Sequence, residues 1–327
     1  MRQPTPADFV IVGIGASAGG LEPLEKFFSQ MPPDSGIGFA VVQHLAPDHE
    51  SALSQLLARC TSMPVEQVRN NTKVAPDRVY IIPPNATLTI QDGLLEVASP
   101  AEARGQRTPI DRFFSSLAHD RGQNAVCIML SGTGSDGTLG LKAIKECGGM
   151  ALAQTLESAR YDSILRSAIG TGLVDHILPV EEMPAKLVEY AAHLASLNGR
   201  SPTVREEISR YLGKIHRLLM RRTGHDFSQY KDGTIARRLE RRMRTLQIDT
   251  VAQYFEILKS RPEEADQLFK DLLIGVTQFF RDPEAFEALA REVVPKLFEG
   301  KENGEQVRAC VVCCASGEEA YSIVACK

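Results

Sequence analysis

An apolar run that ends in a glycine-rich turn near the amino terminus constrains the fold of this chain most. Val10–Val12 leads into the sequence Gly-Ile-Gly-Ala-Ser-Ala-Gly-Gly at residues 13–20, and an amphipathic stretch, Leu21–Gln30, follows. The apolar run is short enough for one buried strand, and the amphipathic stretch has the periodicity of a helix. The sequence therefore predicts a strand, a tight turn and a helix, an arrangement that presents a turn residue at the edge of a sheet.

Two kinds of site fit this turn. Residues 15–19 have the Gly-x-Ser-x-Gly pattern of a nucleophile elbow, in which Ser17 would be the nucleophile. Gly13, Gly15 and Ala18 also fit the dinucleotide-binding fingerprint. That fingerprint needs an acidic residue near the end of the second strand to hold the ribose of a nicotinamide cofactor. The ends of the other strands therefore distinguish the two interpretations.

The ends of two further expected strands favour the nucleophile. The second expected strand, Gly38–Val42, runs into Gln-His, so His44 stands where ribose binding would need a carboxylate. A third, Ala125–Leu130, runs into a glycine-rich loop that contains Asp136. Because the carboxyl ends of parallel strands meet at one edge of a sheet, Ser17, His44 and Asp136 can form a serine-hydrolase triad. The structural alternatives are a histidine satisfied within the fold and an aspartate that caps the next helix.

Strand-like and helix-like segments alternate over residues 1–192, which predicts an α/β domain with a doubly wound, mostly parallel sheet. A hairpin is expected at the edge, around Asp92-Gly93. The other expected strands are Phe9–Gly13, Gly38–Gln43, Val79–Ile82, Ala125–Leu130 and Met150–Gln154, and the expected helices are Leu21–Gln30, Ser51–Thr61, Asp111–Asp120 and Gly137–Cys147.

The pattern changes after residue 192. A linker is expected at 193–205, and a small all-α domain at 206–275 with helices Glu206–Arg222, Thr234–Leu246, Val251–Arg261 and Pro262–Ile274. In the last section, 276–327, the run Val307–Cys314 is expected to form a buried strand before a Ser-Gly-Glu-Glu turn. One strand and one helix cannot bury a core, so this section is expected to be the truncated start of a second α/β domain.

Charge is distributed unevenly. The net charge is −4, yet residues 200–244 hold 13 Lys and Arg against 5 Asp and Glu, which predicts an acidic partner for this basic module. Its second helix has apolar residues at helical spacing, and its arginines are expected to face solvent: Arg237, Arg238, Arg241, Arg242 and Arg244. The segment has neither a helix-turn-helix pattern nor interleaved aromatic residues, so nucleic acid is not the expected partner.

Composition places the chain among soluble proteins of the cytoplasm. We expect no membrane insertion, because no apolar stretch approaches the length of a membrane span, and no room remains for a signal peptide before the first strand. Seven scattered cysteines predict reduced thiols. Cys310, Cys313 and Cys314 lack a second ligand pair at zinc spacing, so they are interpreted as strand residues, and no metal is expected.

Five motifs in order make residues 1–192 resemble the catalytic domain of the chemotaxis protein-glutamate methylesterases (CheB type). They are Gly-Ile-Gly-Ala-Ser-Ala-Gly-Gly at 13–20, Val-Val-Gln-His at 41–44, Pro-Ile-Asp-Arg-Phe-Phe at 109–114, Gly-Thr-Gly-Ser-Asp-Gly at 132–137 and Arg-Ser-Ala-Ile at 166–169. The resemblance implies that Ser17 is the nucleophile, His44 the general base and Asp136 the partner of His44. It also implies hydrolysis of glutamyl methyl esters on chemoreceptors, with glutamine deamidation as a related activity and no cofactor.

The oxyanion that develops during ester hydrolysis needs backbone N–H donors. We expect them in the turn that holds Ser17 and in the loop before Asp136. Ala18, Thr133 and Gly134 are the candidate residues of this oxyanion and substrate loop.

Residues 206–327 resemble the chemotaxis receptor methyltransferases (CheR type). The similarity rests on Asp-Phe-Ser-Gln-Tyr-Lys at 226–231, on the arginine helix and on Val-Thr-Gln-Phe-Phe-Arg-Asp at 276–282. It implies that the basic helix meets acidic receptor helices. It also implies S-adenosylmethionine contacts from Thr277, Arg281 and Glu318. Because the later cofactor and catalytic residues of that family are missing, binding of S-adenosylmethionine and methyl transfer are not expected of this chain.

The hypothesis from the sequence is a serine methylesterase fused to an incomplete methyltransferase, both directed at chemoreceptor helices, with signalling kinases as further candidate partners. The alternative is a catalytically silent scaffold that binds receptors or kinases without turnover.

Overall fold

The computed structural model describes residues 9–43, 53–100, 107–197, 201–228, 230, 232–273, 283–300, 307–312 and 317–325. The chain forms two compact units, residues 1–272 and 273–327. None of the helices in the described ranges combines the length and the apolar composition that crossing a bilayer requires.

A seven-stranded sheet forms the centre of the first unit, and all of its strand pairs are parallel. The strand order is β10-β9-β8-β1-β2-β5-β3, so the chain winds outward from β1 in both directions, as expected for a doubly wound fold. The strands are β1 (Ile11–Ala16), β2 (Gly38–Gln43), β3 (Val65–Gln67), β5 (Arg78–Ile81), β8 (Ala125–Met129), β9 (Met150–Gln154) and β10 (His176–Leu178).

The expected hairpin is present, but it belongs to a separate antiparallel sheet. That sheet has the order β4-β7-β6, with β4 (Thr72–Lys73), β6 (Thr87–Gln91) and β7 (Leu94–Ala98). Asp92 and Gly93, between β6 and β7, have φ values of 51° and 76°. Two consecutive left-handed residues are typical of the type I′ turn, whose twist matches that of the strands it joins.

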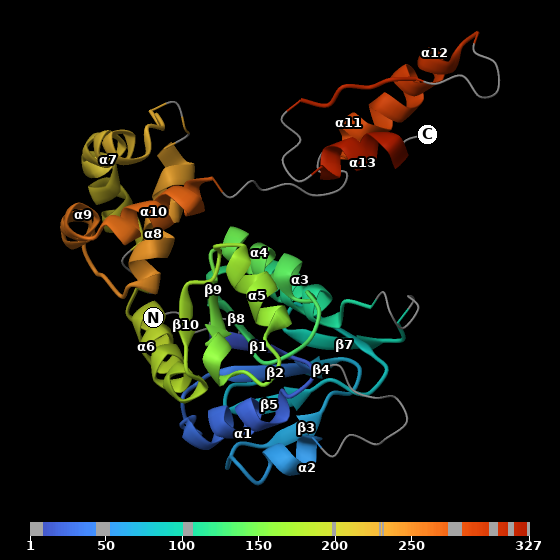
Figure 1. The fold of residues 1–327 in the computed structure, drawn as a ribbon, viewed down its shortest axis with the longest axis vertical. Coiled ribbons are helices and arrows are strands. Elements are labelled where there is room, and N and C mark those ends of the chain that lie inside the picture. Colours follow the sequence, from blue (N-terminus) through green and yellow to red (C-terminus); the bar gives the residue numbers. More distant parts are fainter. Residues whose placement is uncertain are drawn as a thin grey trace. The chain divides into compact units, whose positions relative to one another are not determined.

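Helices cover both faces of the parallel sheet (Figure 1). One face packs against α1 (Leu21–Gln30), α2 (Leu53–Leu57) and α6 (Met183–Leu197). The other packs against α3 (Pro109–Arg121), α4 (Thr138–Glu146) and α5 (Ser163–Gly170). The central strands β1, β8 and β9 are buried on both faces, as the continuous apolar runs of the sequence predict.

The helical part of the first unit has its own apolar core. It comprises α7 (Ser201–Thr223), α8 (Asp232–Thr245), α9 (Val251–Ser260) and α10 (Pro262–Leu272), so the four expected helices are confirmed. Ile215, Leu239 and Tyr254 are among its fully buried side chains. Helices α6 and α7 extend into the segment expected as a linker, which leaves residues 198–200 between them.

The expectation that the arginines of α8 face solvent is wrong for three of the five. Arg238, Arg241 and Arg242 are only 2%, 1% and 4% exposed, whereas Arg237 is exposed and Arg244 half-buried. Periodicity places residues on a helix face but does not show what covers that face. Here carboxylates and backbone carbonyls of neighbouring elements cover the arginines.

The described part of the second unit is helical. It contains α11 (Pro283–Ala288), a π-helical turn at Leu289–Val293, α12 (Val294–Phe298) and α13 (Glu318–Ala325). The strand expected at Val307–Cys314 is wrong over 307–312, which form no strand, while residues 313 and 314 lie outside the described residues. The described residues of this unit offer no second strand for a ladder, and an isolated strand cannot persist alone.

Candidate active site

Ser17 follows the last residue of β1 and begins the turn into α1. Its backbone N–H donates to the carbonyl oxygen of Ser131 (3.1 Å), and its own carbonyl accepts from Gly20 N–H (3.0 Å). The side chain is 7% exposed. Backbone bonds on both sides of the residue therefore fix the turn, and Ser17 is held at the carboxyl end of a central strand as the elbow pattern predicts.

The glycines of this region serve close packing. A Cβ at Gly13 would lie 3.0 Å from the rings of Phe113 and Phe114, and one at Gly15 would lie 2.6 Å from Cγ2 of Ile110. Helix α3 thus lies directly on β1 because these strand residues have no side chain. Close packing thus explains Gly13 and Gly15, two of the three residues that fitted the dinucleotide fingerprint. These glycines therefore no longer favour a dinucleotide-binding site.

Ser131 ties three segments together at the site, although the sequence did not single it out. Its hydroxyl donates to the carbonyl oxygen of Ala18 (3.1 Å) and accepts from Tyr161 N–H (3.0 Å), and its backbone N–H donates to Oε1 of Gln154 (3.0 Å). The residue is fully buried. The position of Ser131 directly after an expected strand was the signal in the sequence that could have identified it. Its hydrogen-bond partners could not be predicted, because they lie in segments that no local pattern connects.

The loop after β8 lies against the serine turn. A Cβ on Gly132 would come within 2.8 Å of Cβ of Ser17, so only glycine fits there. Thr133 and Gly134 are exposed, and the N–H of Gly134 donates to Oγ of Ser163 (3.0 Å). Gly134 therefore anchors this loop to α5, while Ala18, also exposed, lies on the turn itself.

Asp136 caps a helix, but not the one that follows it in the sequence. Its Oδ2 accepts from Ile110 N–H (3.0 Å) and its Oδ1 from Asp111 N–H (2.9 Å), in the first turn of α3. In return, Oδ1 of Asp111 accepts from Gly140 N–H (2.8 Å) in the first turn of α4. Asp136 thus caps α3, and Asp111 caps α4. Backbone amides hold both carboxylate oxygens of Asp136, which is buried.

The acidity of Asp111 is abnormal. Burial raises the pKa of its carboxyl to about 6, and the nearby negative charge of Asp136 adds to the increase, although the N–H of Gly140 opposes it. The negative charge of Asp136 therefore makes ionisation of Asp111 less favourable, as expected for neighbouring buried carboxylates.

The third member of the predicted triad, His44, lies outside the described residues. Strand β2 reaches the level of the serine turn, because Gln43 is the partner of Ala16 in the parallel ladder. The structure places Ser17 and Asp136 in loops that follow the adjacent strands β1 and β8.

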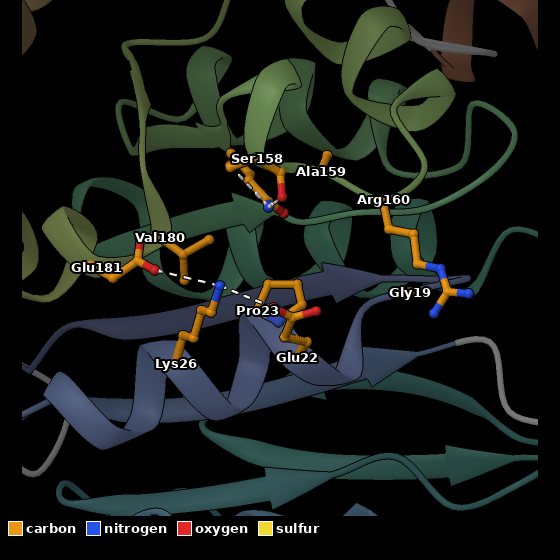
Figure 2. A pocket seen from close by; sticks show the side chains of 10 residues that line it. Gly19, Glu22, Pro23, Lys26, Ser158, Ala159, Arg160, Val180 and Glu181 are labelled. Atoms are coloured by element: carbon orange, nitrogen blue, oxygen red, sulfur yellow. Dashed lines mark hydrogen bonds and ion pairs between the residues drawn. The ribbon is translucent and has the colours of Figure 1, made fainter.

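A pocket of about 260 Å³ opens beside the serine turn (Figure 2). It reaches Gly19, and Nζ of Lys26 on one wall lies 3.0 Å from Oε1 of Glu22 and 3.8 Å from Oε1 of Glu181. Figure 2 shows Arg160 extending from the facing loop. The pocket that reaches Gly19 therefore has charged walls of both signs.

The described residues do not build the expected cofactor contacts. Thr277 and Arg281 lie outside the described residues, and Glu318 begins α13 without a described side chain. A cofactor turn of this type follows a strand, and residues 307–312 form none. No group of three or more potential metal ligands occurs within the described ranges.

The fold is a doubly wound, parallel α/β domain with a serine turn at the carboxyl edge of its sheet, and family comparison identifies the domain further. Residues 12–187 match the model of the CheB methylesterase family, and this chain belongs to that family. Residues 211–273 match the all-alpha domain of CheR methyltransferases, and residues 275–326 match their SAM-binding domain. The resemblances on both sides of the expected linker are thereby confirmed.

Similar proteins extend these matches. A protein of Rhodobacter capsulatus, described as an uncharacterized 104.1 kDa protein, is 36% identical over 292 residues, which cover 83% of this chain and 31% of that protein. A protein-glutamate methylesterase/protein-glutamine glutaminase of Anaeromyxobacter dehalogenans is 33% identical over 55% of this chain and 52% of its own length. This chain therefore spans about half or less of these relatives.

A solved structure confirms the fold of the first domain. The CheB methylesterase catalytic domain of Thermotoga maritima superposes with a TM-score of 0.52 and 28% sequence identity, over 55% of this chain and 98% of that one.

Proposed function

We propose that this chain is a protein-glutamate methylesterase in which Ser17 is the nucleophile, His44 the general base and Asp136 the residue that orients His44. The observation that carries the proposal is the held position of Ser17 at the end of β1, with Gly132 packed against it. A buried carboxylate in the neighbouring loop, satisfied by neutral amide donors, adds support.

In the first half of the reaction, Oγ of Ser17 attacks the ester carbonyl and His44 takes the hydroxyl proton. The oxyanion collapses, the bond to the methoxy group breaks, and His44 returns the proton to release methanol. The glutamyl group is then joined to Ser17 as an ester. Asp136 keeps its negative charge and stabilises the imidazolium form of His44.

In the second half, water attacks the glutamyl-serine ester with His44 again as the base. This step restores the serine hydroxyl and releases a glutamate side chain. The backbone N–H groups of Ala18 and Thr133 are the proposed donors to the oxyanion in both halves. Gly134 supports this loop instead, because its N–H donates to Oγ of Ser163.

The proposed substrate is a methylated glutamate on a cytoplasmic chemoreceptor helix, with glutamine deamidation as a related reaction. The pocket beside Gly19 offers Arg160 to the acidic side chains of such a helix. We place the esterase domain at 1–192, the linker at 193–205, the helical domain at 206–275 and the start of the SAM-binding domain at 276–327. No reaction step is assigned to S-adenosylmethionine.

Methanol release from methylated chemoreceptor tests the proposal. Ser17→Ala should lower the rate about 10⁴-fold, because loss of the nucleophile leaves only binding and electrostatic contributions. Ser29→Ala is the matched control, since the hydroxyl of Ser29 only donates to the carbonyl oxygen of Lys26 within α1 (2.8 Å). Unchanged release by Ser17→Ala would overturn the triad. Receptor binding without methanol release by the wild type would favour a silent scaffold.

A further inference from the structure

The buried arginines of α8 bind backbone carbonyls at the end of α4. Nη1 of Arg238 donates to the carbonyl oxygens of Lys145 (3.1 Å) and Glu146 (3.5 Å), and Nη1 of Arg241 donates to that of Gly149 (3.2 Å). The last carbonyls of a helix lack partners within the helix and carry its negative dipole end. Arginines from α8 therefore cap a helix of the esterase domain.

Asp175 is the acidic centre of this contact. Its carboxylate lies 2.5 Å from Nζ of Lys145, 3.3 Å from Nη1 of Arg241 and 3.2 Å from Nη1 of Arg242, and it accepts from Ala151 N–H (2.9 Å). The side chain is completely buried. One carboxylate of the esterase domain thus faces two arginines of the helical domain.

The helical domain supplies carboxylates that balance the remaining positive charge. Arg242 forms a two-point contact with Glu264, at 2.9 Å from Nε to Oε1 and 2.5 Å from Nη2 to Oε2. Arg241 pairs with Asp271, which also lies 3.7 Å from Nζ of Lys145. Three carboxylates and the cations Lys145, Arg241 and Arg242 therefore form one buried, balanced cluster, as charges removed from water require.

The acidities of the groups agree with this geometry. Burial alone would raise the pKa of Asp175, but Arg241, Lys145 and Arg242 together hold it below its usual range. Burial and the neighbouring Arg241 lower the pKa of Lys145 to about 8, although Asp175 and Asp271 oppose the decrease.

This contact is far from the serine turn in the topology of the sheet. Asp175 immediately precedes β10, and Gly149 immediately precedes β9, so both lie at the amino edge of the sheet. Ser17 and Asp136 follow strands at the opposite, carboxyl edge. The arginines can therefore be bound without covering the candidate active site.

We infer that the arginine face of α8, formed by Arg238, Arg241 and Arg242, is a docking surface for the esterase domain, with Asp175 as its acidic partner. The two domains consequently unfold as one cooperative unit. An acidic partner in solution has no access to these three arginines, and Arg237 is the exposed arginine of the helix.

Hydrogen exchange followed by mass spectrometry on the full chain tests this inference. In Asp175→Asn, peptides covering α8 and residues 145–151 should both exchange about 100-fold faster or more, because removal of one partner leaves buried cations uncompensated. Arg237→Met is the matched control on the same helix and should change neither peptide. Faster exchange at 145–151 with wild-type protection of α8 would overturn the inference, as would no change in either.

A second measurement needs no substitution. In the wild type at increasing urea, the most protected amides of α8 and β9 should exchange with the same free energy and the same urea dependence, because one opening event exposes both. Separate urea dependences would contradict the inference. Poly-L-glutamate should leave the exchange of residues 145–151 unchanged, whereas faster exchange there would show that an acidic polymer displaces Asp175 and would also contradict it.

Discussion

The two edges of the parallel sheet bury aspartates in opposite ways. At the carboxyl edge, Asp136 accepts from the neutral backbone amides of Ile110 and Asp111. At the amino edge, Asp175 is surrounded by Lys145, Arg241 and Arg242.

In the proposed function, this difference separates the carboxylate that orients His44 from the carboxylate that joins the esterase and helical domains. Amide donors stabilise the negative charge of Asp136 without neutralising it, so the charge remains available to a neighbouring imidazole. The cations around Asp175 neutralise it completely, so its effect is to hold two domains together. The proposal therefore assigns catalysis to the carboxyl edge of the sheet and domain contact to its amino edge.

The largest effect expected in this comparison comes from Asp136→Asn. The amide keeps an acceptor for only one of the two α3 amides and cannot stabilise an imidazolium, so methanol release should fall about 10³- to 10⁴-fold. The free energy of unfolding should fall by about 1–3 kcal/mol, because one buried backbone N–H loses its acceptor. Rates and urea unfolding of the same preparation check both values. A rate within tenfold of the wild type would remove Asp136 from the mechanism.

A smaller effect is expected from Gly132→Ala. The new Cβ would come 2.8 Å from Cβ of Ser17 and would displace the nucleophile, so methanol release should fall about 10²-fold. Gly170→Ala is the control, because no atom lies within 4 Å of the Cβ that it adds. Equal rates for the two variants would show that the serine turn tolerates displacement.

The smallest effect concerns Asp111, and it appears in the pH dependence of stability. The folded-state pKa is raised to about 6, above the unfolded value, so the folded state binds more protons and wild-type stability falls as pH rises from about 4 to about 6. Asp111→Asn should remove this slope. At pH 7 its free energy of unfolding should be equal to that of the wild type or higher by up to about 1 kcal/mol. Urea unfolding at pH 4, 5, 6 and 7 measures it. A slope that survives in the variant would assign it to another group.

The sequence predicted the parallel sheet, most helices and the strand-end position of Ser17, because each of these depends on local periodicity and turn composition. It did not predict the short elements β3, β4 and β10, whose two or three residues carry no periodic signal. It also missed α5 and α6.

The details of the site depended on contacts between distant segments. Asp136 was expected to cap the helix that follows it or to orient a histidine; it caps α3, and its role beside His44 stays a prediction. The arginines of α8 were expected in solvent, because their partners Asp175, Glu264 and Asp271 lie elsewhere in the sequence. Such pairings follow from the tertiary fold, and no spacing rule in the sequence encodes them.

The most direct test of the two roles compares methanol release by Asp136→Asn, Asp175→Asn and the wild type. It shows whether catalysis depends on the carboxylate at the carboxyl edge and not on the one at the amino edge. The account predicts a loss of about 10³-fold or more for Asp136→Asn and a rate within about threefold of the wild type, per folded molecule, for Asp175→Asn. Equal losses in the two variants, or a larger loss for Asp175→Asn, would contradict it.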